Sequence, residues 1–178
     1  MSEPVSDLLR ALEPYRGLRS EAVIACDAVE PGAVRRHAQA VMDEHPMYGA
    51  PGDLRWGGPV APALFPALMF RRPLGAADPV EASATDPDYD GSASAGNAGL
   101  PVLEPLRGYA VLNGGSEIEL YRYARHHEQV RMVSHYADFR EKTGRRGPMV
   151  IVVLESEYAT TAGELLLRVR RTYIWSKA

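Results

Sequence analysis

The sequence is short of features that several large protein classes need. Its 178 residues include one cysteine, Cys26, which excludes an intramolecular disulfide and any metal site built on several cysteines. The longest uninterrupted aliphatic run, residues 149–154, is far shorter than the roughly 20 apolar residues of a membrane-spanning helix. Lysine and arginine (20) do not exceed aspartate and glutamate (23), which gives a formal net charge of −3. We therefore expect neither a membrane nor a nucleic-acid partner, because nucleic-acid binding depends on a basic surface.

Several catalytic signatures are also missing. The sequence has no phosphate-binding glycine motif, no nucleophile elbow and no His-Glu-x-x-His zinc helix, which removes several enzyme classes from consideration. The first seven residues, Met-Ser-Glu-Pro-Val-Ser-Asp, are acidic and polar and differ from the basic and then apolar pattern of a secretory signal. Together with the single cysteine, which fits a reducing compartment, they favour a cytoplasmic protein.

What is present predicts one domain over residues 1–178, because 46% hydrophobic residues in a chain of this length close one sizeable core. Residues 1–19 are an N-terminal helical extension. The patterns of the first half favour an opening helix behind Ser6 at residues 6–15, a short strand at 21–29 and an amphipathic helix at 33–44. A turn-rich loop at 47–59 is followed by a buried helix at 61–70, which Pro66 would have to kink or cut short.

The second half has a different character. A long acidic surface insertion is expected at residues 73–104, because its first part carries five acids and no lysine or arginine and ends in a run rich in glycine, serine and alanine. Alternating and β-branched patterns then predict an antiparallel meander, with strands at residues 116–123, 129–139, 149–158 and 164–174. Helices followed by a meander make an α+β fold.

Three segments point to a family. They are Asp43-Glu-His-Pro-Met-Tyr48, Trp56-Gly-Gly-Pro-Val-Ala-Pro62 before the apolar helix, and the turn Glu141-Lys-Thr-Gly-Arg-Arg-Gly147 before a β-branched strand. The sequence resembles the MaoC-like hydratase/dehydratase superfamily over residues 22–174. It looks most like the N-terminal dehydratase domain seen in fungal fatty-acid synthase and in heterodimeric acyl dehydratases.

The resemblance implies a hot-dog fold, in which a curved antiparallel sheet wraps a central helix and two such units form a dimer. It also implies reversible addition of water to a trans-2-enoyl thioester carried on coenzyme A or an acyl carrier protein. In that chemistry an Asp and a His act on one water as general acid and base, and backbone N–H groups stabilise the thioester oxyanion. Neither a metal nor a redox cofactor is implied.

The sequence departs from this family at the catalytic position. Active members read Asp-x-Asn-Pro-(Ile or Leu)-His; here Asp43 is in place, His45 stands at the Asn position and Tyr48 stands where the histidine belongs. A phenol with an ordinary pKa of about 10 is a poor general base at neutral pH. The His-Gly that opens the central helix is replaced by Pro62 and Ala63, and proline has no N–H to donate. His45 is the alternative base.

The resemblance also suggests substrate-binding residues. Val60, Ala61 and Ala63 lie where backbone N–H groups would face the thioester, and Arg145 or Arg146 would meet the carrier's phosphates. Asn113, Gly114 and Gly115 are read either as sheet residues near the acyl site or as an ordinary hairpin turn. A His-His-Glu run at residues 126–128 is read as a solvated turn in preference to a metal cluster.

These patterns favour a subunit of an enoyl-thioester hydratase or 3-hydroxyacyl-thioester dehydratase, which forms the acyl tunnel while a second hot-dog subunit supplies Asp and His. One alternative is a non-catalytic acyl-thioester binding or scaffolding protein. The other is a hot-dog thioesterase, which uses a carboxylate on the central helix, whereas residues 61–70 contain no acid.

Overall fold

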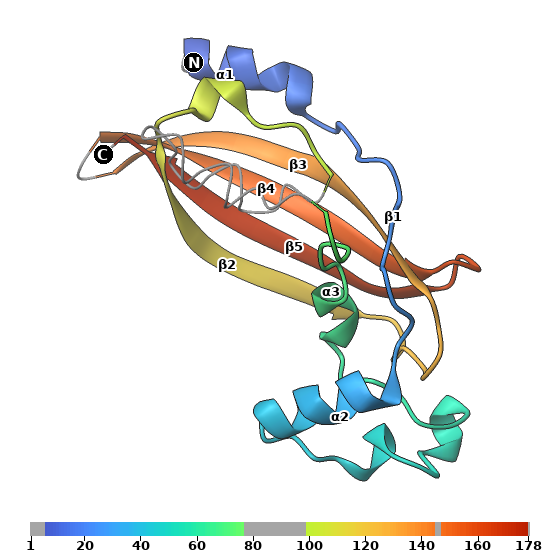
Figure 1. Ribbon diagram of the computed structural model, residues 1–178. Helices are drawn as coiled ribbons and strands as arrows, with labels where there is room; N and C mark the ends of the chain where they lie inside the picture. Colours follow the sequence, from blue (N-terminus) through green and yellow to red (C-terminus); the bar gives the residue numbers. More distant parts are fainter. Residues whose placement is uncertain (1–5, 77–98, 145–146, 178) are drawn as a thin grey trace.

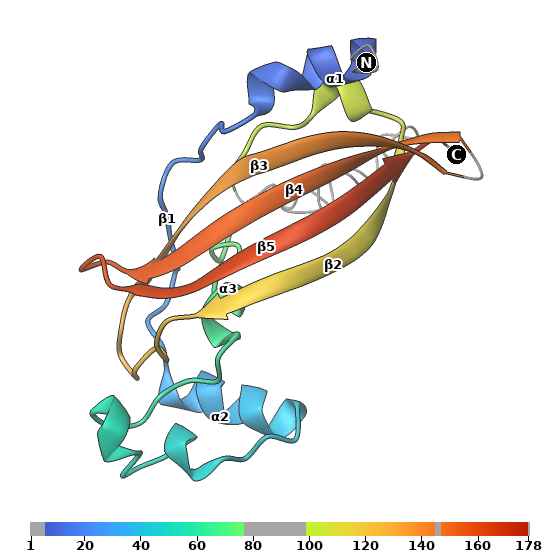
Figure 2. The same cartoon turned by 180° about the vertical axis from the view of Figure 1, so that it is seen from behind.

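A curved antiparallel sheet organises the chain in the computed structural model, which describes residues 6–76, 99–144 and 147–177 (Figure 1). Its strand order is β1-β3-β4-β5-β2, and every neighbouring pair is antiparallel. Figure 2 shows β2 at one edge, beside β5. The strands are β1 (Val23–Ile24), β2 (Ala110–Leu120), β3 (Val130–Gly144), β4 (Gly147–Thr160) and β5 (Leu165–Ser176).

The inner face of the sheet is built from every second residue of each strand, as the pleat requires. On β4 these residues run from Val150 to Tyr158, and they fall into two apolar clusters. The clusters are divided by Ser134 and Ser156, which are fully buried and joined by a 2.8 Å hydrogen bond between their hydroxyls. Because the hydroxyls satisfy each other, the polar pair is tolerated inside the core.

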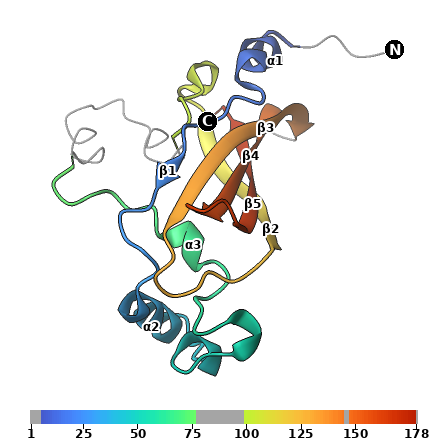
Figure 3. The ribbon, with the colours of Figure 1, turned by 90° about the vertical axis from the view of Figure 1, so that its right-hand side faces the viewer.

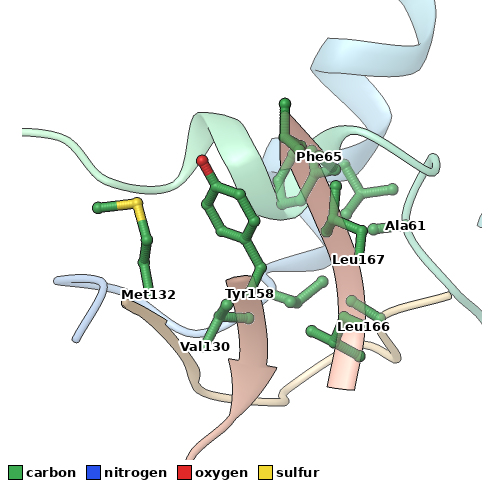
Figure 4. Close-up of a cluster of buried hydrophobic side chains, with 11 residues drawn as sticks. Ala61, Phe65, Val130, Met132, Tyr158, Leu166 and Leu167 are labelled. Carbon is green, nitrogen blue, oxygen red and sulfur yellow. The ribbon is translucent and has the colours of Figure 1, made fainter. Parts of the chain in front are cut away.

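Short helices cover the two halves of this face. Figure 1 shows α1 (Asp7–Leu12) at one end of the sheet and α2 (Pro31–Ala40) beyond the other end. Figure 3 shows the curvature of the strands, with α3 (Phe65–Leu68) beside them. The first cluster brings Ala61 and Phe65 against Tyr158 and Leu167 (Figure 4). The single-turn 3-10 helices are η1 (Glu13–Tyr15), η2 (Pro46–Tyr48), η3 (Leu54–Trp56) and η5 (Glu104–Leu106).

The opening helix is confirmed. Ser6 caps α1 by accepting a 3.1 Å hydrogen bond from the Leu9 N–H, and Leu12 is fully buried in the second cluster. Arg16 then reaches the sheet, where it bonds Asp138 at 2.6 Å. The N-terminal segment therefore contributes to the core and is tied to β3.

The helix predicted at residues 61–70 is cut short, as its Pro66 led us to expect. Only four residues, Phe65–Leu68, are helical, and Pro66 stands at the start of that turn. Pro62 and Pro66 leave no room for a longer helix, because an interior proline removes one hydrogen bond and clashes with the preceding turn. The amphipathic helix is also displaced: it begins at Pro31 and ends at Ala40, since Met42 adopts a left-handed φ of 56°.

The order of strands corrects the predicted meander. Only β3, β4 and β5 follow one another in space; β2 crosses over to pair with β5. Strand lengths also differ from the prediction. The strand β1 has two residues, β2 begins six residues before the expected start at Ser116, and β3 continues to Gly144, beyond its expected end at Phe139.

Part of the predicted surface insertion is core. Residues 77–98, which hold the five acids of its first part, lie outside the described residues, but Leu100 and Leu103 are about 95% buried in the second cluster. Within the part of the chain that the structure describes, no helix is both long and apolar enough to cross a membrane.

Candidate functional site

Asp43 and Tyr48 meet at the end of α2. The left-handed residue Met42 reverses the chain, and the Asp43 N–H closes the turn on the Ala38 carbonyl at 2.9 Å. The 3-10 turn η2 then returns the chain, so that the Tyr48 hydroxyl donates a 2.7 Å hydrogen bond to Oδ2 of Asp43. The positions that hold the Asp and the His in the family's motif are therefore brought together, here as Asp43 and Tyr48.

The environment keeps this phenol protonated. Tyr48 is half-buried against the first apolar cluster, and its pKa is raised to about 12, first by burial and then by its hydrogen bond to the Asp43 carboxylate. A general base must be deprotonated near the working pH. Tyr48 is therefore unsuited to take a proton from water, and it occupies one oxygen of the exposed Asp43 side chain.

His45 is held by its own turn. Its Nδ1 accepts a 3.2 Å hydrogen bond from the Met47 N–H, and its ring lies edge-on to Tyr48 at a centroid distance of 6.0 Å. The side chain is exposed. This geometry uses one imidazole nitrogen as a helix cap, which leaves only Nε2 for chemistry.

Two of the predicted oxyanion donors are already engaged. The N–H of Val60 donates to the Met47 carbonyl at 3.1 Å, and the N–H of Ala61 donates to the Ala124 carbonyl at 2.8 Å. Both residues are fully buried. The prediction that these two N–H groups face a thioester is therefore wrong, because hydrogen bonds that position the loop consume them; Ala63 stays a prediction.

An open cleft of about 970 Å³ lies beside Tyr48. Its walls are α2, most of residues 44–52, and the connection between β2 and β3. His45, His126 and His127 all line it. His127 has a left-handed φ of 69°, which is uncommon outside glycine. The cleft therefore gathers imidazoles from two segments that are about eighty residues apart in the sequence.

His126 is a site residue whose place sequence reasoning missed. Its Nε2 is buried without a hydrogen-bond partner, and burial, followed by the neighbouring His127, lowers its pKa. The expected turn is present at residues 126–127 and His127 is exposed, but His126 and Glu128 are half-buried, and Glu128 pairs with Arg122 at 2.8 Å. The signal was the paired histidines, but nothing local showed that they face the Tyr48 loop. No group of three or more metal-ligating side chains occurs among the described residues.

The predicted substrate-binding residues Asn113, Gly114 and Gly115 do not line the cleft beside Tyr48. They are inside β2, where the register shifts opposite Thr172 and Tyr173, and Oδ1 of Asn113 accepts from the Gly115 N–H at 2.9 Å. The hairpin alternative is therefore wrong. Asn113 lines a second cavity and does not line the cleft beside Tyr48. Arg145 and Arg146 lie outside the described residues.

The strand order and the curved antiparallel sheet fit a hot-dog fold, and the chain belongs to the MaoC-like hydratase/dehydratase superfamily. Residues 23–169 match the family model described as FAS1-like, dehydratase domain region, and the chain belongs to that family. The α+β hot-dog fold predicted from the sequence is thus confirmed.

Solved structures show the same fold. The chain is similar to the ChsH1-ChsH2 complex from Mycobacterium tuberculosis, with a TM-score of 0.71, 18% identity, and coverage of 96% of this chain and 92% of that chain. The HadBC (3R-hydroxyacyl-ACP dehydratase) complex from the same organism has a TM-score of 0.57 and 16% identity, with coverage of 90% of this chain and 96% of that chain. The R-hydratase PhaJ1 from Pseudomonas aeruginosa has a TM-score of 0.56 and 10% identity, with coverage of 94% of this chain and 86% of that chain. Among curated proteins the chain has no match.

Proposed function

We propose that this chain is one subunit of an (R)-specific enoyl-thioester hydratase or 3-hydroxyacyl-thioester dehydratase, whose catalytic Asp and His come from a second hot-dog chain. In this pair the present chain shapes the acyl site. The thioester is carried on coenzyme A or an acyl carrier protein.

The observation that carries the proposal is the Asp43–Tyr48 hydrogen bond. Hydration of an enoyl thioester needs a group that removes a proton from water and returns one to carbon. The phenol of Tyr48, with a pKa of about 12, fills the position of that base and also binds the carboxylate. With the Val60 and Ala61 N–H groups engaged as well, this chain has no suitable base at the motif's histidine position, and two of its expected oxyanion donors are occupied.

The open edge of the sheet supports a partner. β2 is eleven residues long, and ten of them are exposed. The inner-face residues Ile118 and Leu120 are 46% and 41% exposed, although they continue the apolar surface of Val169 and Leu167 across the sheet. A long unpaired edge with exposed apolar side chains invites pairing with another strand.

The inner face near that edge also carries an unmatched charge. Arg171 lies between the two apolar clusters, opposite Leu154 on one side and Ser116 on the other, and is half-buried. In the part of the chain that the structure describes, it forms no ion pair or hydrogen bond through its side chain. A half-buried cation of this kind favours an acidic or oxyanionic group supplied from outside the chain.

The structural neighbours support hydratase or dehydratase chemistry and a second subunit. ChsH1-ChsH2 and HadBC are complexes, HadBC is a 3R-hydroxyacyl-ACP dehydratase, and PhaJ1 is an R-hydratase. The Asp43–Tyr48 geometry is the reason to place this chain in the non-catalytic half of such a pair.

The test begins with the purified chain alone. Hydration of a short trans-2-enoyl-CoA is followed by loss of the conjugated-thioester absorbance, with Asp43→Ala as the matched variant. We expect neither protein to turn the substrate over, while equilibrium dialysis still detects binding of the thioester. Turnover by the native chain that disappears in Asp43→Ala would overturn the proposal, because it would show that the chain has a complete site of its own.

A further inference from the structure

The outer face of the sheet, made of the residues that alternate with the inner ones, carries charges in columns along the strands. The column is acidic on β4, basic on β5 and acidic again on β2, so that the strand register forms two rows. The first row is Glu155, Arg170 and Glu117; the second is Glu157, Arg168 and Glu119. Opposite charges on neighbouring strands stabilise a sheet. The alternation therefore favours a basic column on a strand added next to β2.

The acids of β4 have basic groups on both sides. Glu157 pairs with Arg168 of β5 at 2.9 Å and with Arg19, which lies beside β3, at 3.4 Å. Glu155 pairs with Arg168 at 3.4 Å and has the ring of His135, on β3, 3.9 Å away on its other side. The negative charge of this column is therefore matched within the sheet.

The acids of β2 have a basic group on one side only. Glu119 pairs with Arg168 at 3.0 Å, but the same guanidinium also serves both acids of β4. Glu117 is exposed, and its side chain forms no hydrogen bond or ion pair within residues 6–76, 99–144 and 147–177. On the other side of these acids is the open edge of the sheet (Figure 2). The unmatched negative charge of the outer face therefore lies along that edge.

The inner face carries the opposite charge near the same edge. Arg171 of β5 is half-buried, and its side chain has no partner in the described part of the chain. Its neighbour toward the edge is Ser116, which is small and exposed. A residue on a strand added to β2 would be two strand spacings, or about 10 Å, from the Arg171 backbone. An arginine and a carboxylate side chain together cover this span.

A second copy of this chain does not match these charges. Antiparallel pairing of β2 with its own copy joins outer face to outer face and inner face to inner face. It sets Glu117 and Glu119 of one copy beside the same acids of the other, and it brings the two copies of Arg171 toward each other. Like charges on adjoining strands oppose pairing, and charged side chains on edge strands commonly prevent self-association.

We propose that β2 selects its partner by charge. It accepts a strand with lysine or arginine on the outer face and aspartate or glutamate on the inner face, and it rejects a second copy of this chain. This inference rests on the proposed function for the identity of the partner as a second hot-dog chain. It adds the charge pattern of the partner's edge, and it makes the assembly a pair of unlike chains.

The experiment uses the chain as its own charge-reversed partner. Glu117→Lys/Glu119→Lys gives β2 a basic outer column and leaves its apolar inner side chains in place. Sedimentation velocity compares the native chain, the variant and their equimolar mixture. We expect each protein alone to be monomeric at about 50 mM salt, and the mixture to dimerise with a Kd at least about tenfold below that of native self-association. The mixed dimer should dissociate at about 500 mM salt, which screens exposed charges.

Two further variants control for net charge and for folding. Glu21→Lys/Glu104→Lys makes the same change in net charge at exposed positions outside β2, and its mixture with the native chain is expected to stay monomeric. Glu117→Lys alone breaks no ion pair of the described residues and should give a weaker mixed dimer, which keeps the test valid if the double variant folds poorly. Thermal melts check each fold. Adding Arg171→Glu to the double variant is expected to tighten the mixed dimer several-fold.

Self-association of the native chain as tight as that of the mixture would overturn the inference. So would equal behaviour of the edge and control variants, or a mixed dimer that high salt leaves intact, and no gain from Arg171→Glu would overturn its inner-face part. These measurements involve neither a thioester nor turnover. Their failure would leave the hydratase proposal standing, whereas turnover by the native chain alone would remove that proposal without changing how the two edges associate.

Discussion

The Tyr48 hydroxyl donates a 2.7 Å hydrogen bond to Oδ2 of Asp43, so the phenol is held protonated and one carboxylate oxygen is occupied. The contact depends on the left-handed turn at Met42, which brings the end of α2 back toward η2. The hydrogen bond therefore ties η2 to the end of α2. This relationship leads directly to a prediction about ionisation.

Replacing Asp43 with Asn is expected to lower the pKa of Tyr48 from about 12, although not to the ordinary value of 10. Burial is the larger cause of the raised pKa and remains in the variant, whereas the carboxylate's hydrogen bond and charge are removed. Titration of the tyrosine ring carbons by NMR measures the change. Glu119→Gln is the matched control, because it removes the equivalent carboxylate from Tyr121 and leaves Tyr48 untouched.

The same pKa fixes the pH dependence of stability. The pKa of Tyr48 is higher in the folded chain than in the unfolded chain. The contribution of Tyr48 to the free energy of unfolding is therefore complete below pH 10 and is lost as the pH rises from 10 to about 12. Urea unfolding across this range should therefore show a smaller alkaline loss for Tyr48→Phe than for the native chain. An identical loss in both would mean that Tyr48 titrates as an exposed phenol.

The buried serine pair predicts a non-additive effect. Ser134→Ala leaves the Ser156 hydroxyl buried without its partner and is expected to cost about 1–3 kcal/mol of unfolding free energy. The double variant Ser134→Ala/Ser156→Ala removes both groups and should be at least as stable as either single variant. Urea denaturation measures all three; strictly additive losses would contradict the proposed role of the pair.

A histidine placed at position 48 is not expected to give this chain hydratase activity. Tyr48→His places an imidazole beside Asp43, but the N–H groups of Val60 and Ala61 stay engaged and Pro62 has none. Loss of a single oxyanion donor costs a factor of about 10²–10³ in turnover. Hydration by Tyr48→His alone is therefore expected to stay at background. Turnover by Tyr48→His that disappears when Asp43→Ala is added would show that the histidine was the only missing part.

The exposed edge strand β2 predicts which substitutions weaken binding of the second hot-dog chain. Ile118→Asp puts a charge on the exposed apolar inner face of β2 and is expected to weaken binding of the second hot-dog chain at least about tenfold, or ~1.4 kcal/mol. Ile24→Asp makes the same substitution at an exposed isoleucine of β1, at the opposite edge of the sheet, and should bind as the native chain does. Sedimentation of the mixed chains measures both. Equal weakening by the two variants would place the interface elsewhere.

The strands could be predicted because their signal is local. Alternation along residues 116–123 and 164–174 reports the pleat directly, and Ser6 identifies a helix start from its side chain alone. The fold class followed from these patterns. The family followed from short motifs, since residues 43–48 keep their spacing although the catalytic histidine is replaced.

The rest depends on contacts between distant segments. Alternation within β2 does not say that its neighbour is β5, and the apolar composition of residues 61–70 predicted a helix that two prolines shorten. The position of His126 in the cleft requires the β2–β3 connection to fold against the Tyr48 loop, which no local pattern encodes. For the same reason the engaged N–H groups of Val60 and Ala61 appear only in the structure.

The most direct measurement of the central claim is reconstitution with a second hot-dog chain that carries an intact Asp-x-Asn-Pro-x-His motif. Hydration of trans-2-enoyl-CoA is compared for the native pair, for the pair with Asp43→Ala in this chain, and for the pair with the motif Asp→Ala in the partner. The account predicts that the first two are active and the third is inert. Loss of activity with Asp43→Ala, together with retained activity when the partner's Asp is replaced, would contradict it.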